Sequence, residues 1–444
     1  MYHDLTKGNI SRALLLFALP MLAGNLLQQF YNIVDTLIVG RVLGSNALAA
    51  VGAAYTLMTF LTSIFVGLSM GSGALFSICR GKGDAGGLQA AIAHSFALIM
   101  GITVALNVAV YLGLGPILSF LQVPQTVWAG MRAYLLVIFA GLPATSLYNY
   151  FACLLRALGN SKTPLVFLAV SAVLNVGLDL LFVVVFPWGI SGAALATVLA
   201  QYVAGFGILA YVAVRCRDIL PTWRDLHFDR AVLREIVSLS ALTCAQQSVM
   251  NFGILMVQGL VNSFGPVVMA AFAAAVKVDT FAYLPVQDFG NAYSTFVAQN
   301  YGAQNHERIR RGTREAFRVS LLFSLGLSAA VVLLARPLML LFVRAADTAV
   351  ILAGVRYLRI EGAFYCGIGC LFLLYGYFRA VKRPGVSVVL TVLSLGTRVA
   401  LAYLLSAQMG QTGIWLAIPI GWGLADLVGL LCMKKSAAQL ARNL

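Results

Sequence analysis

The chain is short of charge, and that shortage excludes a soluble protein. Only 10% of its 444 residues are Asp, Glu, Lys or Arg, against about 25% in soluble domains. Hydrophobic residues make up 61%, and apolar runs of roughly 20 residues, long enough to cross a bilayer, recur from end to end. We therefore expect an all-α polytopic membrane protein that is surrounded by lipid and has little soluble mass.

The chain also lacks any motif of catalysis or nucleotide binding in a fitting context. The run Gly81–Gly86 matches G-x-G-x-x-G, but no strand precedes it, and no Walker-type loop is present, so ATP is not the energy source. The four histidines are spread out and the seven cysteines are scattered, which argues against a metal site. We expect a protein that is not an enzyme and carries no cofactor.

Acidic residues are scarce, with 15 Asp and Glu against 30 Lys and Arg. The resulting net charge of +15 does not require nucleic acid as a partner, because membrane proteins concentrate Lys and Arg in cytoplasmic loops. With the N-terminus placed inside, 22 of the 30 Lys and Arg fall in cytoplasmic segments and only Arg41, Arg336 and Arg344 in outer loops. This asymmetry predicts that both termini are cytoplasmic.

About twelve membrane spans are expected from the apolar runs. Their approximate cores are 13–39, 47–78, 91–113, 128–151, 165–186, 192–214, 232–262, 267–299, 316–335, 350–375, 386–406 and 412–433. The polar segment at mid-chain carries charges of both signs and reads as a linker. We predict an N-terminal six-helix lobe (1–218), a cytoplasmic linker (219–230) and a C-terminal six-helix lobe (231–444).

The two halves repeat one another in sequence. Gly189-Ile-Ser-Gly-Ala-Ala-Leu-Ala recurs as Gly410-Gln-Thr-Gly-Ile-Trp-Leu-Ala, and Gly44 and Gly81 match Gly265 and Gly302 at the same offset. Because each half has six spans, both begin on the same side of the membrane, which predicts a pseudo-two-fold axis along the membrane normal. Two such lobes with a cleft between them are typical of alternating access.

The fifth expected span carries polar residues that lipid does not favour. Ser171, Asn175 and Asp179 are four residues apart, so they stack on one helix face. A carboxylate at bilayer depth costs about 2.5–3.5 kcal/mol on insertion scales. A chain that keeps Asp179 there uses it for a cation, a proton or a partner charge.

The first span has a matching polar stripe that ends at Asp35. At 1.5 Å of rise per residue, Asp35 and Asp179 fall in the outer half of the membrane, where they would share a pocket. Two carboxylates with amide and hydroxyl oxygens suit Na⁺, and two adjacent acids also suit a proton. The plainer alternative is that each acid pairs with a neighbouring helix.

Several short motifs resemble those of the MATE (multidrug and toxic compound extrusion) family. They are Leu19-Pro20 with Asp35, the Gly81–Asp84 and Gly302–Asn305 turns, Leu155–Pro164 and Gly189–Thr197. The resemblance covers essentially the whole chain and the duplicated layout. It implies cation-coupled export of amphipathic, often cationic compounds, and a cation site in the N-terminal lobe. The matching positions are Asp35, Asn149, Asn175, Asp179 and Thr197.

This resemblance also implies a monomer in a bacterial cytoplasmic membrane. The alternative function is a flippase for a lipid-linked or polysaccharide precursor, from the wider superfamily. Such flippases have additional spans and a strongly cationic cleft, whereas this chain has few cleft cations beyond Lys277 and Arg398. The sequence therefore favours the drug antiporter, and it leaves the choice between Na⁺ and H⁺ open.

The second half departs from the first at the acidic position. Alignment of Gly177 with Gly396 puts Arg398 opposite Asp179, so only the first lobe is expected to hold the ion. Arg398 needs a partner, and Glu361 and Asp426 are candidates for a structural ion pair.

Candidate residues for the substrate cleft are polar or aromatic. Asp279 and Asp288 would meet a cationic substrate, although pairing with Lys277 is an alternative for them. Gln247 belongs to a polar stripe on the seventh span. The wall candidates, each of which has ordinary packing as its alternative, are Tyr31, Met256, Phe281 and Tyr283.

Overall fold

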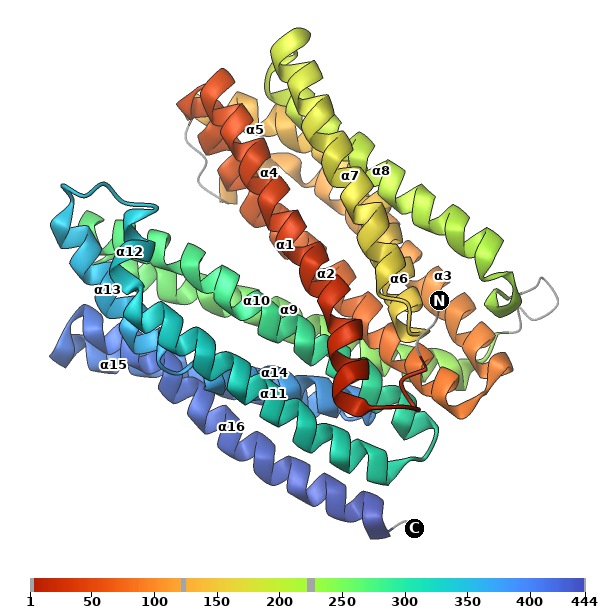
Figure 1. The fold of residues 1–444 in the computed structure, drawn as a ribbon. Helices are drawn as coiled ribbons and strands as arrows, with labels where there is room; N and C mark the ends of the chain where they lie inside the picture. The colour runs from red at the N-terminus through yellow and green to blue at the C-terminus, as the bar shows by residue number, and fades with distance from the viewer. Residues whose placement is uncertain (1–3, 121–124, 222–227, 443–444) are drawn as a thin grey trace. The chain divides into compact units, whose positions relative to one another are not determined.

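The computed structural model describes residues 4–120, 125–221 and 228–442, and every regular element in these ranges is a helix (Figure 1). The α-helices are α1 (Ile10–Val42), α2 (Ser45–Lys82), α3 (Ala85–Leu112), α4 (Leu114–Phe120), α5 (Gln125–Ile138), α6 (Leu142–Ala157), α7 (Lys162–Asp179), α8 (Gly189–Arg215), α9 (Arg230–Asn262), α10 (Pro266–Gly302), α11 (His306–Leu333), α12 (Ala335–Leu340), α13 (Thr348–Gly362), α14 (Tyr365–Ala380), α15 (Pro384–Met409) and α16 (Gln411–Arg442). The short elements are η1 (Phe139–Gly141) and η3 (Arg217–Ile219), which are 3-10 helices, and η2 (Leu180–Val185), a π-helix.

Ten helices of the described chain are long and apolar enough to cross a membrane, and α13 with α14 makes an eleventh span that is bent by 50°. The expected span 232–262 coincides with α9, in which the side chains of residues 252–255 lie outside the description. The expected span 350–375 is wrong in one detail, because its helix is interrupted between Gly362 and Tyr365.

The span expected at 128–151 is also interrupted, by η1 between α5 and α6. Pro143 stands in the first turn of α6, and proline has no N–H to donate to the preceding turn. The α5–α6 and α13–α14 breaks fall at corresponding places in the two halves.

The helices form two compact units. The first unit contains residues 19–244 and the second contains residues 4–18 and 245–444. The division falls within α1 and within α9, so each of these helices belongs to both units. Residues 222–227 of the expected linker lie outside the described residues.

The repeat seen in the sequence is present in the backbone. Three pairs of residues with positive φ are separated by the same offset (265 − 44 = 221), and a fourth pair is separated by 382 − 159 = 223. The pairs are Gly44 and Gly265, Gly83 and Gln304, Gly189 and Gly410, and Gly159 and Lys382. The chain therefore turns in the left-handed region at equivalent points of both halves.

The turns that resemble the MATE motifs begin α3 and α11. The Asp84 carboxylate accepts a hydrogen bond from the Gly87 N–H at 2.8 Å, and the Asn305 amide oxygen accepts one from the Arg308 N–H at 3.1 Å. Each side chain satisfies one of the N–H groups that a helix start leaves unpaired. The same capping device therefore opens the third span of each half.

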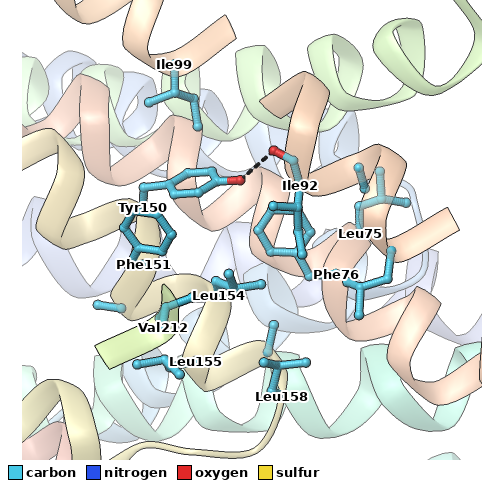
Figure 2. Close-up of a cluster of buried hydrophobic side chains, with 14 of the residues drawn as sticks. Leu75, Phe76, Ile92, Ile99, Tyr150, Phe151, Leu154, Leu155, Leu158 and Val212 are labelled. Carbon is cyan, nitrogen blue, oxygen red and sulfur yellow. Dashed lines mark hydrogen bonds between the residues drawn. The ribbon is translucent and has the colours of Figure 1, made fainter. Parts of the chain in front are cut away.

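The core of the first unit has an aromatic centre where α2, α3 and α6 meet. Tyr150 is fully buried among Phe76, Phe96 and Phe151. Its hydroxyl donates to the Ile92 carbonyl at 2.8 Å (Figure 2). The buried phenol keeps its polar tip satisfied, as buried tyrosines usually do.

Close glycine contacts join α2 to the first half of α9, as the small-residue spacing Gly67–Gly71 predicts. A Cβ added to Gly67 would lie 2.4 Å from the Cys244 Cα, and one added to Gly71 would lie 2.4 Å from the Ser240 Cα. The Ser240 hydroxyl donates to the Leu68 carbonyl at 3.0 Å. The prediction of close helix packing at this spacing is confirmed.

In the second unit, the segment before α1 is held by side chains of α10 and α11. Leu5 is fully buried and its N–H donates to the Gln299 side-chain oxygen at 3.2 Å. The Arg308 guanidinium donates to the carbonyls of Leu5, Lys7 and Gly8 at 3.2, 2.7 and 2.9 Å. These bonds fix the start of the chain on the second unit.

Candidate functional site

One face of α7 turns its polar residues inward. Ser171, Asn175 and Asp179 are 9%, 2% and 0% exposed, whereas Val173 on the opposite face is 75% exposed. The Ser171 hydroxyl donates to the Ala200 carbonyl of α8 at 2.8 Å. The four-residue spacing read from the sequence therefore places all three polar groups against the protein and leaves Val173 exposed.

Asn175 is oriented by its neighbour on α8. Its amide nitrogen donates to the Thr197 hydroxyl at 3.3 Å, and that hydroxyl donates to the Ala193 carbonyl at 3.2 Å. This arrangement leaves the amide oxygen of Asn175 buried with no hydrogen-bond partner among the described residues. Thr197 thus fixes the direction in which the Asn175 oxygen points.

Asp35 of α1 and Asp179 of α7 are neighbours that interact electrostatically. Neither oxygen of Asp179 has a hydrogen-bond partner in the described part of the chain, and the same holds for Oδ1 of Asp35. The amide oxygen of Asn175, one turn before Asp179 on the same face of α7, is the fourth buried oxygen in this condition. Because buried acceptors are normally satisfied, this set fits a bound cation or proton.

Two tyrosines lie close to the acids. Tyr134 of α5 interacts electrostatically with both Asp35 and Asp179, and Tyr31 of α1 interacts with Asp35. Sequence analysis missed Tyr134, and it assigned Tyr31 to the substrate cleft. The only sequence signal for Tyr134 is the repeat, because Tyr134 and Tyr357 share the 223-residue offset of Gly159 and Lys382.

Asn149 is placed differently from the other expected ligands. Its amide nitrogen donates to the Thr145 carbonyl of its own helix at 2.8 Å, and among the described residues it makes no hydrogen bond to either acid. Its role in the cation site stays a prediction from the family resemblance alone.

The backbone changes form directly after Asp179. The π-helix η2 begins at Leu180, and the Phe186 N–H donates to the Leu181 carbonyl at 2.9 Å, five residues back. Single π-helical turns inside α-helices often occur at functional sites. Here the widened turn lies next to the carboxylate whose two oxygens are unpartnered.

The second unit holds its own buried acids. Asp279 and Glu361 are each 6% exposed, and both interact electrostatically with Arg398. Asp426, the other expected partner of Arg398, instead interacts with the Cys370 thiol. In the described ranges, no group of three or more His, Cys, Asp or Glu side chains could hold a metal ion.

The other cleft candidates differ in exposure. Asp288 is 2% exposed, and the Tyr283 ring stacks on Phe372 at 6.4 Å. Met256 and Phe281 are 45% and 43% exposed, and Gln247 is half-buried. A substrate role for these residues stays a prediction.

Comparison with known proteins identifies relatives along most of the chain. The MatE family model matches residues 20–181 and 240–404. The chain is 32% identical over 417 residues to the probable multidrug resistance protein YpnP of Bacillus subtilis, covering 94% of this chain and 93% of the relative. It is 24% identical over 433 residues to the probable multidrug resistance protein NorM of Thermotoga maritima, covering 94% and 90%.

Solved structures share the fold. A MATE protein in complex with MaL6 superposes with a TM-score of 0.93 at 22% identity, over 99% of this chain and 98% of that one. An outward-facing MATE family multidrug resistance transporter of the MOP superfamily superposes with a TM-score of 0.92 at 22% identity, over 98% of each chain. These matches confirm the expected all-α fold with two lobes, and the chain belongs to the MatE family of multi-pass membrane transporters.

Proposed function

We propose that the protein is a cation-coupled antiporter that exports amphipathic, often cationic compounds. Relatives along its whole length carry the names of multidrug resistance or export proteins, and MatE is a family of transporters rather than enzymes. What we propose is that transport is coupled to Na⁺ or H⁺ and that the ion and the exported compound move in opposite directions. The observation that supports them best is the Asp35–Asp179 pocket, with its buried and unpartnered oxygens.

The pocket supplies a reason for an ion to bind. Two carboxylates at bilayer depth are unfavourable when charged, and a bound Na⁺ or proton removes part of that cost. An ion that binds one conformation more tightly than another shifts the population toward it. Ion entry from outside would therefore drive the change that releases drug, and drug binding would weaken ion binding by the same factor.

Each side chain has a role in this proposal. Asp35 and Asp179 hold the ion through their carboxylates, and Asn175 adds a neutral oxygen. Thr197 is a positioning residue, because it holds the amide nitrogen of Asn175 away from the acids. Tyr134 and Tyr31 border the acids and limit the space that water can fill.

The proposal includes an orientation with both termini in the cytoplasm of a bacterial cell and the chain in its cytoplasmic membrane. The excess of Lys and Arg in alternate loops supports it. A fluorescent reporter fused after Leu444 should be active, because it folds in the cytoplasm. An alkaline phosphatase fused at the same place should be inactive, and activity of the phosphatase would contradict the orientation.

Dye efflux tests the coupling. Purified protein is reconstituted in liposomes with a fluorescent cationic dye, and Na⁺ and proton gradients are imposed separately. Wild-type protein should transport dye when one of these two ion gradients is imposed. Asp179→Asn should transport no more dye than protein-free liposomes do. Asp347→Asn is the control, because Asp347 is an exposed acid before α13. Ion-driven efflux at the wild-type rate in Asp179→Asn would overturn the proposed role.

A further inference from the structure

The first half of α11 carries a row of exposed arginines. Arg311, Arg314 and Arg318 are three and four residues apart, so they lie on one face of the helix, and all three are exposed. The opposite face contains Gly312 and Ala316, which are buried. The three arginines therefore form a basic stripe that points away from the packed side of α11.

The basic stripe continues into exposed leucines on the same face. Leu322 and Leu325 follow Arg318 in steps of four and three residues, and they are 62% and 49% exposed. No charged residue lies between Arg318 and Arg336, and α11 is long and apolar enough to cross a membrane. At 1.5 Å of rise per residue, the stretch from Arg314 to Leu325 covers about 16 Å. A lipid-facing helix surface that changes from arginine to leucine passes from the headgroup layer into the hydrocarbon.

Two arginines of the basic stripe have no partner from the described part of the protein. The Arg311 guanidinium donates to the Glu307 carboxylate at 2.7 Å. The nearby Glu315 carboxylate accepts a hydrogen bond from a serine hydroxyl of α1 at 3.2 Å. Arg314 and Arg318 form no ion pair with any acid among the described residues. Two guanidinium groups one helical turn apart are therefore available to an anion from outside the protein.

The equivalent helix of the first unit has no such stripe. Both α3 and α11 are 28 residues long, and their first and last residues are separated by the same offset (306 − 85 = 221 and 333 − 112 = 221). At the three positions of the basic stripe α3 has alanines, which are Ala90, Ala93 and Ala97. The third span of the repeat therefore forms without arginines on this face, so the membrane topology alone does not explain why α11 has them.

We propose that the basic stripe of α11 binds an anionic phospholipid of the surrounding bilayer. Arg314 and Arg318 hold the phosphate, because a guanidinium donates parallel hydrogen bonds to phosphate oxygens, and the acyl chains lie along Leu322 and Leu325. A zwitterionic lipid binds more weakly, since its own cation offsets the attraction of its phosphate to basic side chains. Lipid binding here is independent of the proposed coupling ion, because the stripe shares no residue with the acid pocket of the first unit.

Thermal stabilisation by added lipid tests the site. Purified protein in detergent is titrated with dioleoyl-phosphatidylglycerol or with dioleoyl-phosphatidylcholine, which has the same chains and a zwitterionic headgroup. The melting temperature of the wild type should rise by about 2–5 °C more with phosphatidylglycerol, and the rise should saturate. Arg314→Gln combined with Arg318→Gln should lose most of this difference. The control combines Arg336→Gln with Arg344→Gln, which removes two exposed arginines beyond the end of α11 and therefore the same charge.

Three results would overturn the proposal. One is a stripe variant that keeps the wild-type lipid response, and another is an equal loss in the control variant, which would show that only net charge matters. The third is an equal rise with inorganic phosphate, which has no chains to contact the leucines and would identify a site for free anions. Native mass spectrometry gives a second readout, in which the wild type should retain more phosphatidylglycerol than the stripe variant, and equal retention would contradict the site.

Discussion

The first unit and the second each place a tyrosine beside two acidic side chains, but the two sets differ in one charge. In the first, Asp35 and Asp179 face each other with no cation from the protein among the described residues. In the second, Arg398 acts on Asp279 and Glu361. A carboxylate pair without a basic neighbour is the better candidate for an exchangeable ion, which is why the proposed cation site lies in the first unit.

The largest expected contrast comes from removing one acid of each pocket. Asp179→Asn should abolish the ion-dependent rise in melting temperature of the purified protein, because it removes a ligand. Asp279→Asn should keep that ion response, whatever its effect on absolute stability, because Asp279 already interacts electrostatically with Arg398. If Asp279→Asn loses the response and Asp179→Asn keeps it, the two pockets have the opposite roles.

Removal of the Asn175 amide oxygen is expected to have the next largest effect, on ion affinity. Asn175→Leu keeps the volume but removes an oxygen ligand, so the ion affinity should fall about tenfold, equal to about 1.4 kcal/mol. The measurement is the ion concentration at half-maximal melting shift. Asn107→Leu on α3 is the control, because it makes the same substitution outside the proposed site. Leu178→Ala would not serve, because it changes packing. An unchanged midpoint in Asn175→Leu would exclude the amide as a ligand.

Substitution at the glycine contact between α2 and α9 tests helix packing in the first unit rather than ion binding. Gly71→Ala places a Cβ against the Ser240 backbone, and overpacking of this kind costs about 1–3 kcal/mol. The melting temperature should fall with the ion response intact. Gly101→Ala is the matched control, since nothing lies within 4 Å of the added Cβ. Equal melting temperatures in the two variants would contradict the close contact.

The smallest expected effect is that of Thr197→Val. The substitution removes the hydroxyl that accepts from the Asn175 amide, so the amide oxygen loses its orientation but remains present. We expect ion affinity to weaken about two- to fivefold, equal to about 0.4–1 kcal/mol. Titration of the melting shift measures it. A loss as large as that of Asn175→Leu would show that Thr197 is itself a ligand.

Much of the fold follows from the sequence because a bilayer allows few structures. Apolar length fixes the spans, and lipid requires helices. The breaks at Phe139–Gly141 and between Gly362 and Tyr365 did not follow, because apolar length alone does not locate a bend. Pro143 gave a signal for the first break.

The first pocket was predictable in part. Asp179 and Asn175 follow from polar residues at helical spacing in an apolar span, and their inward direction is borne out by their burial. Tyr134 did not follow, because a tyrosine in an amphipathic helix has no distinguishing pattern of its own. Glu361 was expected as a partner of Arg398, and the two interact electrostatically. The electrostatic interaction of Arg398 with Asp279 did not follow from the sequence, because it depends on how the helices pack.

Ion release on dye binding tests the central claim most directly. A cationic dye is added to purified, ion-loaded protein in weakly buffered solution, and released protons and Na⁺ are measured with indicators. The account predicts that wild-type protein releases one kind of ion as dye binds, and that Asp179→Asn binds dye without release. Release by Asp179→Asn equal to that of wild type would contradict the assignment of the exchangeable ion to the first pocket.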